Sequence, residues 1–188
     1  MTANTFLFRR LMPAIAGLVA MGLSAMTAGA AAPIKIGYVG GISGPCGGLT
    51  HSARKAMKIA LKEINDTGGA SGRPIEVIWR DSKTKPDEGA KQARDLILTE
   101  KVHILTGVCS SSVFMAINPV AKQYGVPLVS SISGTHKATI DFGHPFVFQT
   151  QPHTLMEGKA LAEYAAANGW KNIVTMGLDY EWGRTTVK

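Results

Sequence analysis

Three consecutive serines, Ser110, Ser111 and Ser112, follow an apolar run and precede a helix-like pattern in GVCSSSVFMAI, residues 107–117. A helix that begins near Ser112 would present free backbone N–H groups and the positive end of its dipole. Such a helix end can bind a carboxylate or phosphate without a cation, and Ser110 and Ser111 could both donate to the anion. A single serine would suffice as a cap, so capping and anion binding both stay open.

The same turn offers two nucleophiles, Ser110 and Cys109, which would suit an exported α/β hydrolase. Either would need a histidine within hydrogen-bond reach, and His136 is the one histidine in a candidate site loop. Asp81, at the end of an expected strand, is a candidate general base or a surface or capping residue. The sequence has no dinucleotide fingerprint, no phosphate-binding P-loop and no G-x-S-x-G nucleophile elbow. The residues alone therefore favour a binding protein without a cofactor over an enzyme, and both stay open at this point.

Charge and histidine spacing argue against nucleic-acid binding and against a metal site. The formal net charge of +7 is spread along the chain, and aromatic residues make up 7% of it. A nucleic-acid footprint would cluster basic residues with aromatic side chains between them. A zinc site would need closely spaced ligand pairs, which the histidines do not form. They are His51, His103, His136, His144 and His153.

Residues 1–32 have the composition of a secretory signal. Arg9 and Arg10 precede the apolar run LMPAIAGLVAMGLSAM, and the small residues of TAGAAAP follow it. The apolar run is short for a membrane span. We expect export and cleavage near Ala30–Ala32, and the twin arginines leave the Sec and Tat routes open.

Apolar runs with strand character alternate with helix-like patterns from Pro33 onward. This alternation indicates parallel strands joined by right-handed crossovers, and hence a doubly wound α/β sheet. The expected strands are IKIGYVG (34–40), IEVIW (75–79), VHILTG (102–107), VPLVSS (126–131), FVFQTQ (146–151) and NIVTMG (172–177). The expected helices cover about 51–65, a stretch from Pro86, about 112–124, a stretch from Thr154 to Gly169, and the final LDYEWGRTTVK.

Two helix starts carry local signals. Pro86 suits the first turn of a helix, and Asp87 and Glu88 complement the positive end of its dipole. Thr154 and Glu157 have the spacing of a capping box, which predicts Thr154 as a cap.

Three polar loops leave the carboxyl ends of the expected strands, where ligands bind in such sheets. They are residues 40–50, 108–112 and 130–139, and all are rich in glycine, serine or threonine. We expect the ligand site at this edge. Cys46 and Cys109 lie in the first two loops, so a disulfide between them is geometrically allowed in an exported chain. The sequence leaves bridged and free cysteines open.

The order of these motifs resembles that of periplasmic solute-binding proteins of branched-chain amino-acid-type ABC transporters, the leucine/isoleucine/valine-binding group. The likeness runs from about Ile34 to Lys188. It implies a type I periplasmic binding fold, in which two α/β lobes close on a small molecule. The chain would then hold most of a first lobe (33–149) and the opening of a second (150–188). The stretches that carry the likeness are IKIGYVGGISGP, ALKEINDTGGASGRPIEVIWRDSKTKPDEGAKQA, GVCSSS, GVPLVSSISGT, PFVFQTQP, EGKALAEY and DYEWGR.

The resemblance also implies roles for residues of two loops. In relatives the serine turn holds the α-carboxylate of the ligand, and Ser110 matches its first serine. The loop after the fourth strand gives relatives a backbone carbonyl for the α-ammonium, which is here that of Ile132. It also gives a threonine hydroxyl for the carboxylate. That position falls on Gly134, or on Thr135 with a one-residue shift, and Ser133 is close to it.

Three further positions follow from the resemblance. Leu49 lies where some relatives place an aromatic residue. Trp182 lies where relatives carry a tyrosine that faces the cleft from the second lobe. Relatives with a disulfide at the serine turn pair it with the position of Thr84, so a bridge from Cys109 to Cys46 would differ from theirs.

The implied function is that of a periplasmic protein that binds a small carboxylate-bearing solute, most consistent with an amino acid. It would deliver the solute to the membrane permease of an ABC transporter, with no nucleic-acid partner. Two alternatives remain, the exported hydrolase and a ligand-sensing domain of a receptor, which shares the fold.

Overall fold

A five-stranded parallel sheet organises the chain, and its strand order is β2-β1-β3-β4-β5. The computed structural model describes residues 31–187, so nearly all of the predicted signal segment lies outside the described residues. The order reverses at β1, which pairs with both β2 and β3. The predicted doubly wound α/β sheet is confirmed. Its strands are β1 (Ile34–Gly40), β2 (Ile75–Asp81), β3 (Ile104–Thr106), β4 (Leu128–Ser130) and β5 (Val147–Gln149).

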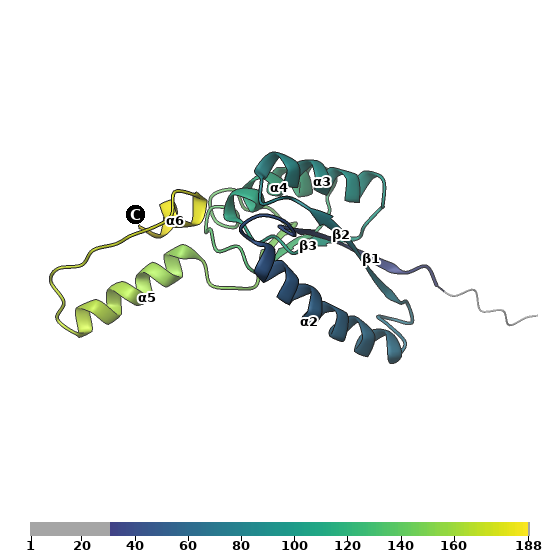
Figure 1. The fold of residues 1–188 in the computed structure, drawn as a ribbon, viewed down its shortest axis with the longest axis horizontal. Helices are drawn as coiled ribbons and strands as arrows, with labels where there is room; N and C mark the ends of the chain where they lie inside the picture. The colour runs from purple at the N-terminus through teal and green to yellow at the C-terminus, as the bar shows by residue number, and fades with distance from the viewer. Residues whose placement is uncertain (1–30, 188) are drawn as a thin grey trace, which may run out of the picture. The chain divides into compact units, whose positions relative to one another are not determined.

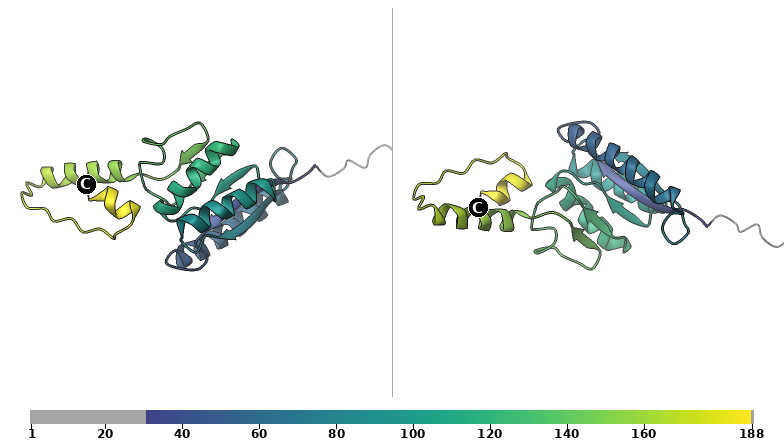
Figure 2. Two further views of the ribbon diagram at one scale, coloured as in Figure 1. Left: turned by 90° about the horizontal axis from the view of Figure 1, so that it is seen from above. Right: turned by 90° about the horizontal axis from the view of Figure 1, so that it is seen from below.

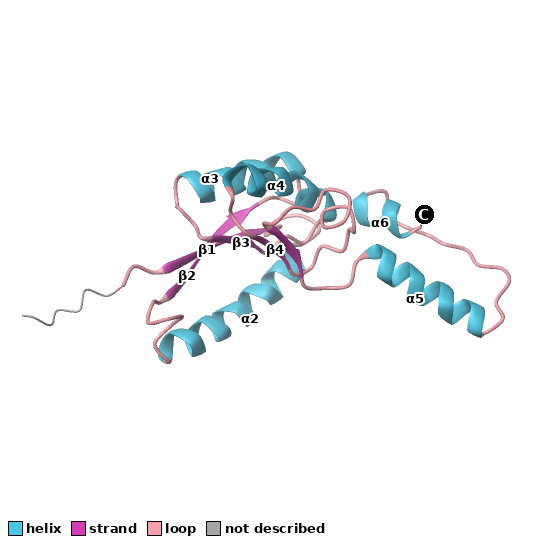
Figure 3. Ribbon diagram, turned by 180° about the vertical axis from the view of Figure 1, so that it is seen from behind, coloured by secondary structure: helices cyan, strands magenta, loops and turns pink. Residues whose placement is uncertain are grey.

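Helices cover both faces of this sheet (Figure 1). Helix α2 (Gly47–Asp66) lies on one face, and α3 (Pro86–Leu98) and α4 (Ser111–Tyr124) lie on the other (Figure 3). Helix α5 (Thr154–Ala167) leads away from the sheet, and the chain returns to α6 (Glu181–Thr186), as Figure 2 shows. Within the described part of the chain, no helix is long and apolar enough to cross a membrane.

The main hydrophobic core lies between the sheet and the helices α3 and α4. Leu96 of α3, Phe114 and Ile117 of α4, and Leu105 and Leu128 of the strands are fully buried. Burying a large apolar side chain contributes about 1.5–3 kcal/mol. This packing fixes α4 on the sheet, so the N-terminal end of α4 has a defined place beside the carboxyl ends of β3 and β4.

The helix starts differ from prediction at α2 and agree at α3. Helix α2 begins at Gly47, four residues before the expected start, because the Cys46 carbonyl already accepts the N–H of Thr50 at 3.0 Å. Helix α3 begins at Pro86, with two acidic residues in its first turn as predicted.

The predicted capping box at Thr154 is wrong. Helix α5 starts at Thr154 itself, and its cap is His153, whose side chain accepts from the Met156 N–H. The Thr154 hydroxyl instead lies 2.7 Å from Nδ1 of His136. A histidine nitrogen thus replaces the expected threonine oxygen as the acceptor at this helix end.

The strand predicted for residues 172–177 is also wrong, since this segment has no regular structure. Its apolar side chains are open to solvent, and Val174 and Met176 are 95% and 97% exposed. A strand requires a neighbour to receive its backbone hydrogen bonds. No other strand among residues 31–187 pairs with this segment.

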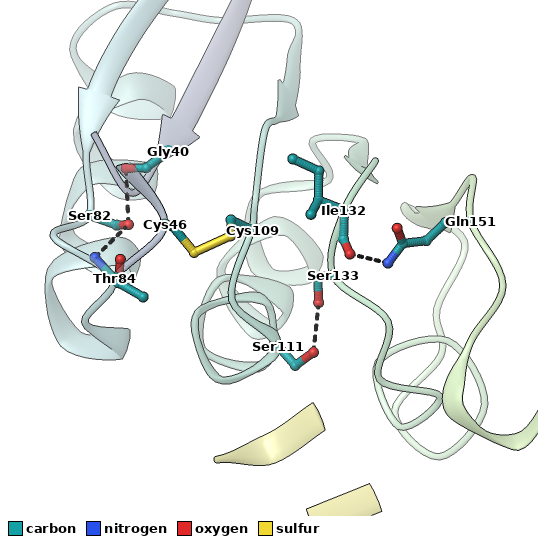
Figure 4. Close-up of a disulfide and its surroundings, with 9 residues drawn as sticks. All are labelled: Gly40, Cys46, Ser82, Thr84, Cys109, Ser111, Ile132, Ser133 and Gln151. Atoms are coloured by element: carbon teal, nitrogen blue, oxygen red, sulfur yellow. Dashed lines mark hydrogen bonds between the residues drawn. A yellow bond between two sulfur atoms is a disulfide. The ribbon is translucent and has the colours of Figure 1, made fainter. Parts of the chain in front are cut away.

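The loops that leave β1, β2 and β3 are tied together at the carboxyl edge (Figure 4). Of the two states that the sequence leaves open, the structure has the bridged one: Cys46 and Cys109 form a disulfide with a Cα–Cα distance of 6.3 Å. Nearby, the Ser82 hydroxyl donates to the Gly40 carbonyl at 3.0 Å and accepts from the Thr84 N–H at 3.3 Å. The edge loops are therefore held by covalent and polar links.

Asp81 fixes the loop after β1 from the end of β2. Its carboxylate accepts from the Ser43 hydroxyl at 2.6 Å, the Ser43 N–H at 3.2 Å and the Lys83 N–H at 2.8 Å. Partial burial raises the pKa of Asp81, but the hydrogen bonds from Ser43, Lys83 and Ile42 outweigh it and hold the pKa below its ordinary value. Asp81, the candidate general base of the sequence analysis, thus uses its carboxylate to hold the loop after β1.

We expect Asp81→Asn to destabilise the folded protein at neutral pH by no more than about 1 kcal/mol, because the lost hydrogen bonds are partly open to solvent. The pKa of Asp81 is lower in the folded than in the unfolded state. Its contribution is therefore present above the unfolded pKa and is lost as the pH falls through the folded one. Urea unfolding of the full-length protein between pH 7 and pH 3 measures this contribution.

The matched control for this experiment is Glu76→Gln, which removes a charge from the same strand. Glu76 is exposed, and its side chain has no hydrogen bond or ion pair within residues 31–187. We expect it to leave the acid dependence of stability unchanged. Equal pH profiles for wild type and Asp81→Asn would contradict the role of Asp81.

The disulfide generates a second prediction. Replacing Cys46 and Cys109 with alanine should lower the free energy of unfolding by about 4 kcal/mol, because the bridge spans 63 residue steps and restricts the unfolded chain. Denaturant unfolding of the full-length protein with and without reductant checks it. Reductant should weaken the wild type and leave the double variant unchanged, and a wild type indifferent to reductant would refute the bridge.

Candidate ligand-binding site

A cavity of about 630 Å³ opens at the carboxyl edge of the sheet. This volume lies in the range of small-molecule binding sites. The loops after β1, β2, β3 and β4 form its wall together with the approach to α6. The lining residues include no acidic or basic side chain; they are Pro45, Cys46, Leu49, Thr84, Pro86, Cys109, Ser110, Ser111, Ser112, Ile132, Gly134, Leu178, Tyr180 and Trp182.

The turn from β3 into α4 begins at Gly107. Its backbone is left-handed, with φ of 91°, and a Cβ there would lie 2.4 Å from the ring of Tyr38. Glycine is the residue that adopts this conformation without strain and leaves room for the ring. The turn therefore brings Cys109 to the disulfide and Ser110 to the start of the helix.

Ser110 is the N-cap residue of α4, yet its side chain makes no capping hydrogen bond. Its carbonyl accepts from the Phe114 N–H at 2.9 Å, while its hydroxyl has no hydrogen-bond partner within residues 31–187. The residue is only 8% exposed and lines the cavity. The first amides of α4 also lack acceptors inside the helix. One hydroxyl and the positive end of a helix are thus available to an anion in the cavity.

The rest of the cavity wall is largely apolar. Leu49 of the first turn of α2 and Ile132 of the loop after β4 line it, and so do Tyr180 and Trp182 at α6. The two aromatic rings have centroids 6.3 Å apart and are tilted by 34°. Aromatic and aliphatic walls suit an apolar or aromatic body on the ligand.

Two polar contacts hold α6 at the rim of the cavity. The ammonium of Lys137, in the loop after β4, lies 3.0 Å from the carboxylate of Glu181. The Glu181 N–H donates to the Ser112 hydroxyl at 3.4 Å. Because these contacts join α6 to the loop after β4 and to the first turn of α4, Tyr180 and Trp182 are kept at the cavity.

The backbone carbonyls of the loop after β4 are occupied by glutamine side chains. The amide of Gln151 donates to the Ile132 carbonyl (Figure 4), and that of Gln149 donates to the Ser133 carbonyl at 3.0 Å. These bonds connect the loop to the end of β5. They also use the carbonyl of Ile132, which the resemblance implies as the acceptor for an ammonium.

Gly134 lies directly against Trp182. A Cβ at this position would be 3.0 Å from both Cδ1 and Nε1 of the indole, which is tighter than ordinary contact. The Gly134 carbonyl accepts from the Thr154 N–H at 2.9 Å. Glycine at this position therefore makes room for the indole.

The structure brings most of the predicted site residues to one cavity and places two beside it. Ser133 is buried, and its hydroxyl donates to that of Ser111 at 3.2 Å. Thr135 is also buried, and its hydroxyl accepts from the Lys137 N–H at 3.3 Å. The predicted residues that line the cavity are Leu49, Ser110, Ser111, Ile132 and Trp182, together with the cysteines Cys46 and Cys109.

Several residues in or beside the cavity were not predicted as site residues. Tyr180 could have been found from its position two residues before Trp182. Thr84 lines the cavity with a buried hydroxyl that has no hydrogen-bond partner among the described residues. Gln149 and Gln151 gave no signal, because a strand-end glutamine has no characteristic spacing.

The contacts that a hydrolase would need are not formed within residues 31–187. Nδ1 of His136 lies 2.7 Å from the Thr154 hydroxyl, and no hydrogen bond joins His136 to Ser110 among the described residues. Cys109 is in the disulfide. No group of three or more potential metal ligands occurs in the part of the chain that the structure describes.

Comparison with known proteins finds relatives among Leu/Ile/Val-binding protein homologs. The chain is 32% identical over 139 residues to Leu/Ile/Val-binding protein homolog 7 of Brucella suis biovar 1 (strain 1330), covering 72% of this chain and 34% of that protein. It is 27% identical over 166 residues to homolog 6 of Brucella abortus (strain 2308), covering 87% of this chain and 42% of that protein. The chain thus spans well under half the length of these relatives.

Two solved structures show the fold. The solute-binding protein of an ABC transporter from Rhodopseudomonas palustris BisB5, in complex with 3,4-dihydroxy benzoic acid, matches with a TM-score of 0.70 and 26% identity, over 82% of this chain and 41% of that one. The branched-chain amino acid transporter substrate-binding protein LivJ of Streptococcus pneumoniae, in complex with isoleucine, matches with a TM-score of 0.66 and 29% identity, over 71% of this chain and 38% of that one.

A family model described as periplasmic binding protein matches residues 33–188. This match covers every strand and helix of the described structure. The chain belongs to the periplasmic binding protein family.

Proposed function

We propose that this chain is part of an exported solute-binding protein that captures a small carboxylate-bearing solute and delivers it to the permease of an ABC transporter. The observation that carries the proposal is the uncharged cavity at the start of α4, where Ser110 is only 8% exposed and its hydroxyl has no partner within the described residues. The solved relatives hold isoleucine and a dihydroxybenzoic acid, and both solutes have a carboxylate. An amino acid is the solute class that the resemblance favours.

Recognition of the carboxylate would use hydrogen bonds and the helix dipole. The amides of Ser111 and Ser112 and the hydroxyl of Ser110 would donate to its two oxygens. A hydrogen bond to a charged group contributes about 1.5–3 kcal/mol, and a helix N-terminus adds to it. The site would hold an anion without a buried lysine or arginine, so no cation is left uncompensated when the solute leaves.

Trapping would follow from closure of two lobes. Residues 33–149 would form most of the first lobe, and residues 150–188 would open the second, to which Tyr180 and Trp182 belong. A solute that contacts both sides stabilises the closed arrangement by the difference in its affinity for the closed and open states. No bond of the solute needs to change, in keeping with a binding protein and no enzyme.

Location follows from the leader-like segment. Residues 1–32 would direct export and be removed near Ala30–Ala32, leaving a periplasmic protein that meets its permease at the membrane. Neither cofactor nor metal has a role in this proposal.

The proposal predicts that Ser110→Ala weakens solute binding about tenfold to a hundredfold, because one hydrogen bond to a charged oxygen is lost. The measurement is isothermal titration of the full-length protein with the carboxylate that stabilises it most in a thermal-shift screen. Such a ligand at 100 times its dissociation constant adds about 2.7 kcal/mol of stability.

Ser52→Ala is the control, since Ser52 is an exposed serine of α2 that does not line the cavity. It should leave the affinity unchanged. Wild-type affinity in Ser110→Ala would remove Ser110 from the site, and a screen in which no carboxylate stabilises the protein would refute the proposed function.

A further inference from the structure

We infer that the disulfide between Cys46 and Cys109 is a positioning element of the ligand site: oxidation of the two cysteines raises the solute affinity, and a bound solute in turn favours the oxidised form. The inference rests on the proposed function and adds a means of regulating the same site. It goes beyond the stability that the bridge gives the fold, because it concerns the affinity of molecules that are folded in both redox states.

The disulfide joins the starts of two helices. Cys46 is the N-cap residue of α2, and Cys109 directly precedes Ser110, the N-cap residue of α4. Neither helix has a side-chain cap or an acidic residue in its first turn, whereas α3 begins with two acidic residues. Both helix starts therefore present uncompensated backbone amides, and their relative position matters to an anion in the cavity.

Each cysteine belongs to a different segment of the cavity lining. Residues 45–49 contribute Cys46, and residues 109–112 contribute Cys109. Figure 4 shows the disulfide as the link between the loop that leads into α2 and the turn that leads into α4. The bridge therefore sets how far apart these two parts of the lining lie.

The disulfide is the one bond between these segments in the described part of the chain. Between residues 43–49 and residues 109–112, no hydrogen bond or ion pair is formed within residues 31–187. The first segment is tied to β2 through Ser43 and Asp81. In the second, the hydroxyls of Ser111 and Ser112 bond to Ser133 and to the N–H of Glu181. Without the bridge, the two segments would move with different neighbours.

Reduction would break this link by thiol–disulfide exchange with a dithiol such as dithiothreitol. A thiolate of the reagent attacks one sulfur of the bridge, and the other sulfur leaves as a thiolate and takes up a proton. The second thiol of the reagent then resolves the mixed disulfide. The products are two cysteine thiols and the cyclic oxidised reagent. The reduced protein would have to order the two segments as it binds the solute, which lowers its affinity.

Affinity and oxidation are linked reciprocally. If oxidation raises the solute affinity by a given factor, then saturating solute shifts the thiol–disulfide equilibrium toward the disulfide by the same factor. For a two-electron couple, a tenfold factor corresponds to about 30 mV in the midpoint potential. The inference can therefore be measured from both sides.

Isothermal titration of the full-length protein, oxidised and in dithiothreitol, measures the affinity side. The probe is isoleucine, replaced by 3,4-dihydroxybenzoate if isoleucine does not bind, and otherwise by the carboxylate that stabilises the protein most in the thermal-shift screen. We expect Kd to rise about tenfold on reduction. The double variant Cys46→Ala and Cys109→Ala should show the same rise, with no further effect of reductant.

A redox titration measures the other side. The wild type is equilibrated in buffers with graded ratios of reduced to oxidised dithiothreitol, and its free thiols are counted by alkylation. The midpoint potential should be about 30 mV lower with saturating probe than without it, matching the tenfold change in Kd.

Leu96→Ala is the matched control for lost stability. Leu96 is fully buried in α3 and does not line the cavity, and its truncation destabilises the core by an amount similar to loss of the bridge. This variant should keep the wild-type affinity. Circular dichroism checks that every sample is folded, and trimethylamine N-oxide is added to all samples if any is not.

The outcomes separate this inference from the proposed function. Equal affinities of the folded oxidised and reduced proteins, or a midpoint potential that the probe does not move, would overturn the inference and leave carboxylate capture standing. An equal loss of affinity in Leu96→Ala would also overturn it, because stability alone would then control binding. If no carboxylate of the screen binds the oxidised protein, both proposals are wrong.

Discussion

The rest of the site depends on one constraint, the position of the first turn of α4 at the carboxyl edge of the sheet. Phe114 and Ile117 bury the helix against β3 and β4, and the turn at Gly107 fits around the ring of Tyr38. The disulfide at Cys109 ties the residue just before the helix to the loop after β1. The free amides at the start of α4 consequently have a fixed direction, which is what an uncharged anion site requires.

Around this helix end, the edge loops satisfy their own polar groups and leave few for a ligand. Asp81 and Ser82 hold the loops after β1 and β2, and the glutamines at the end of β5 hold the loop after β4. What remains open to the cavity is the hydroxyls of Ser110 and Thr84, helix amides and apolar side chains.

Sequence periodicity predicted the sheet and its helices, because strand and helix patterns depend on local side-chain spacing. It failed at residues 172–177, where an apolar run has no neighbouring strand within the described chain, and at Thr154, where a histidine caps the helix. The loops could be assigned to one edge from topology alone. Their contacts could not, because the bond from Gln151 to Ile132 and the fit of Trp182 on Gly134 join residues whose spacing carries no pattern.

The most direct test of the central claim is a crystal structure of the full-length protein with its solute bound. The account predicts a carboxylate within hydrogen-bond distance of the Ser110 hydroxyl and of the amides that begin α4, with the apolar part of the solute against Trp182. A solute bound elsewhere, or one whose carboxylate is paired with a lysine or arginine far from α4, would contradict it.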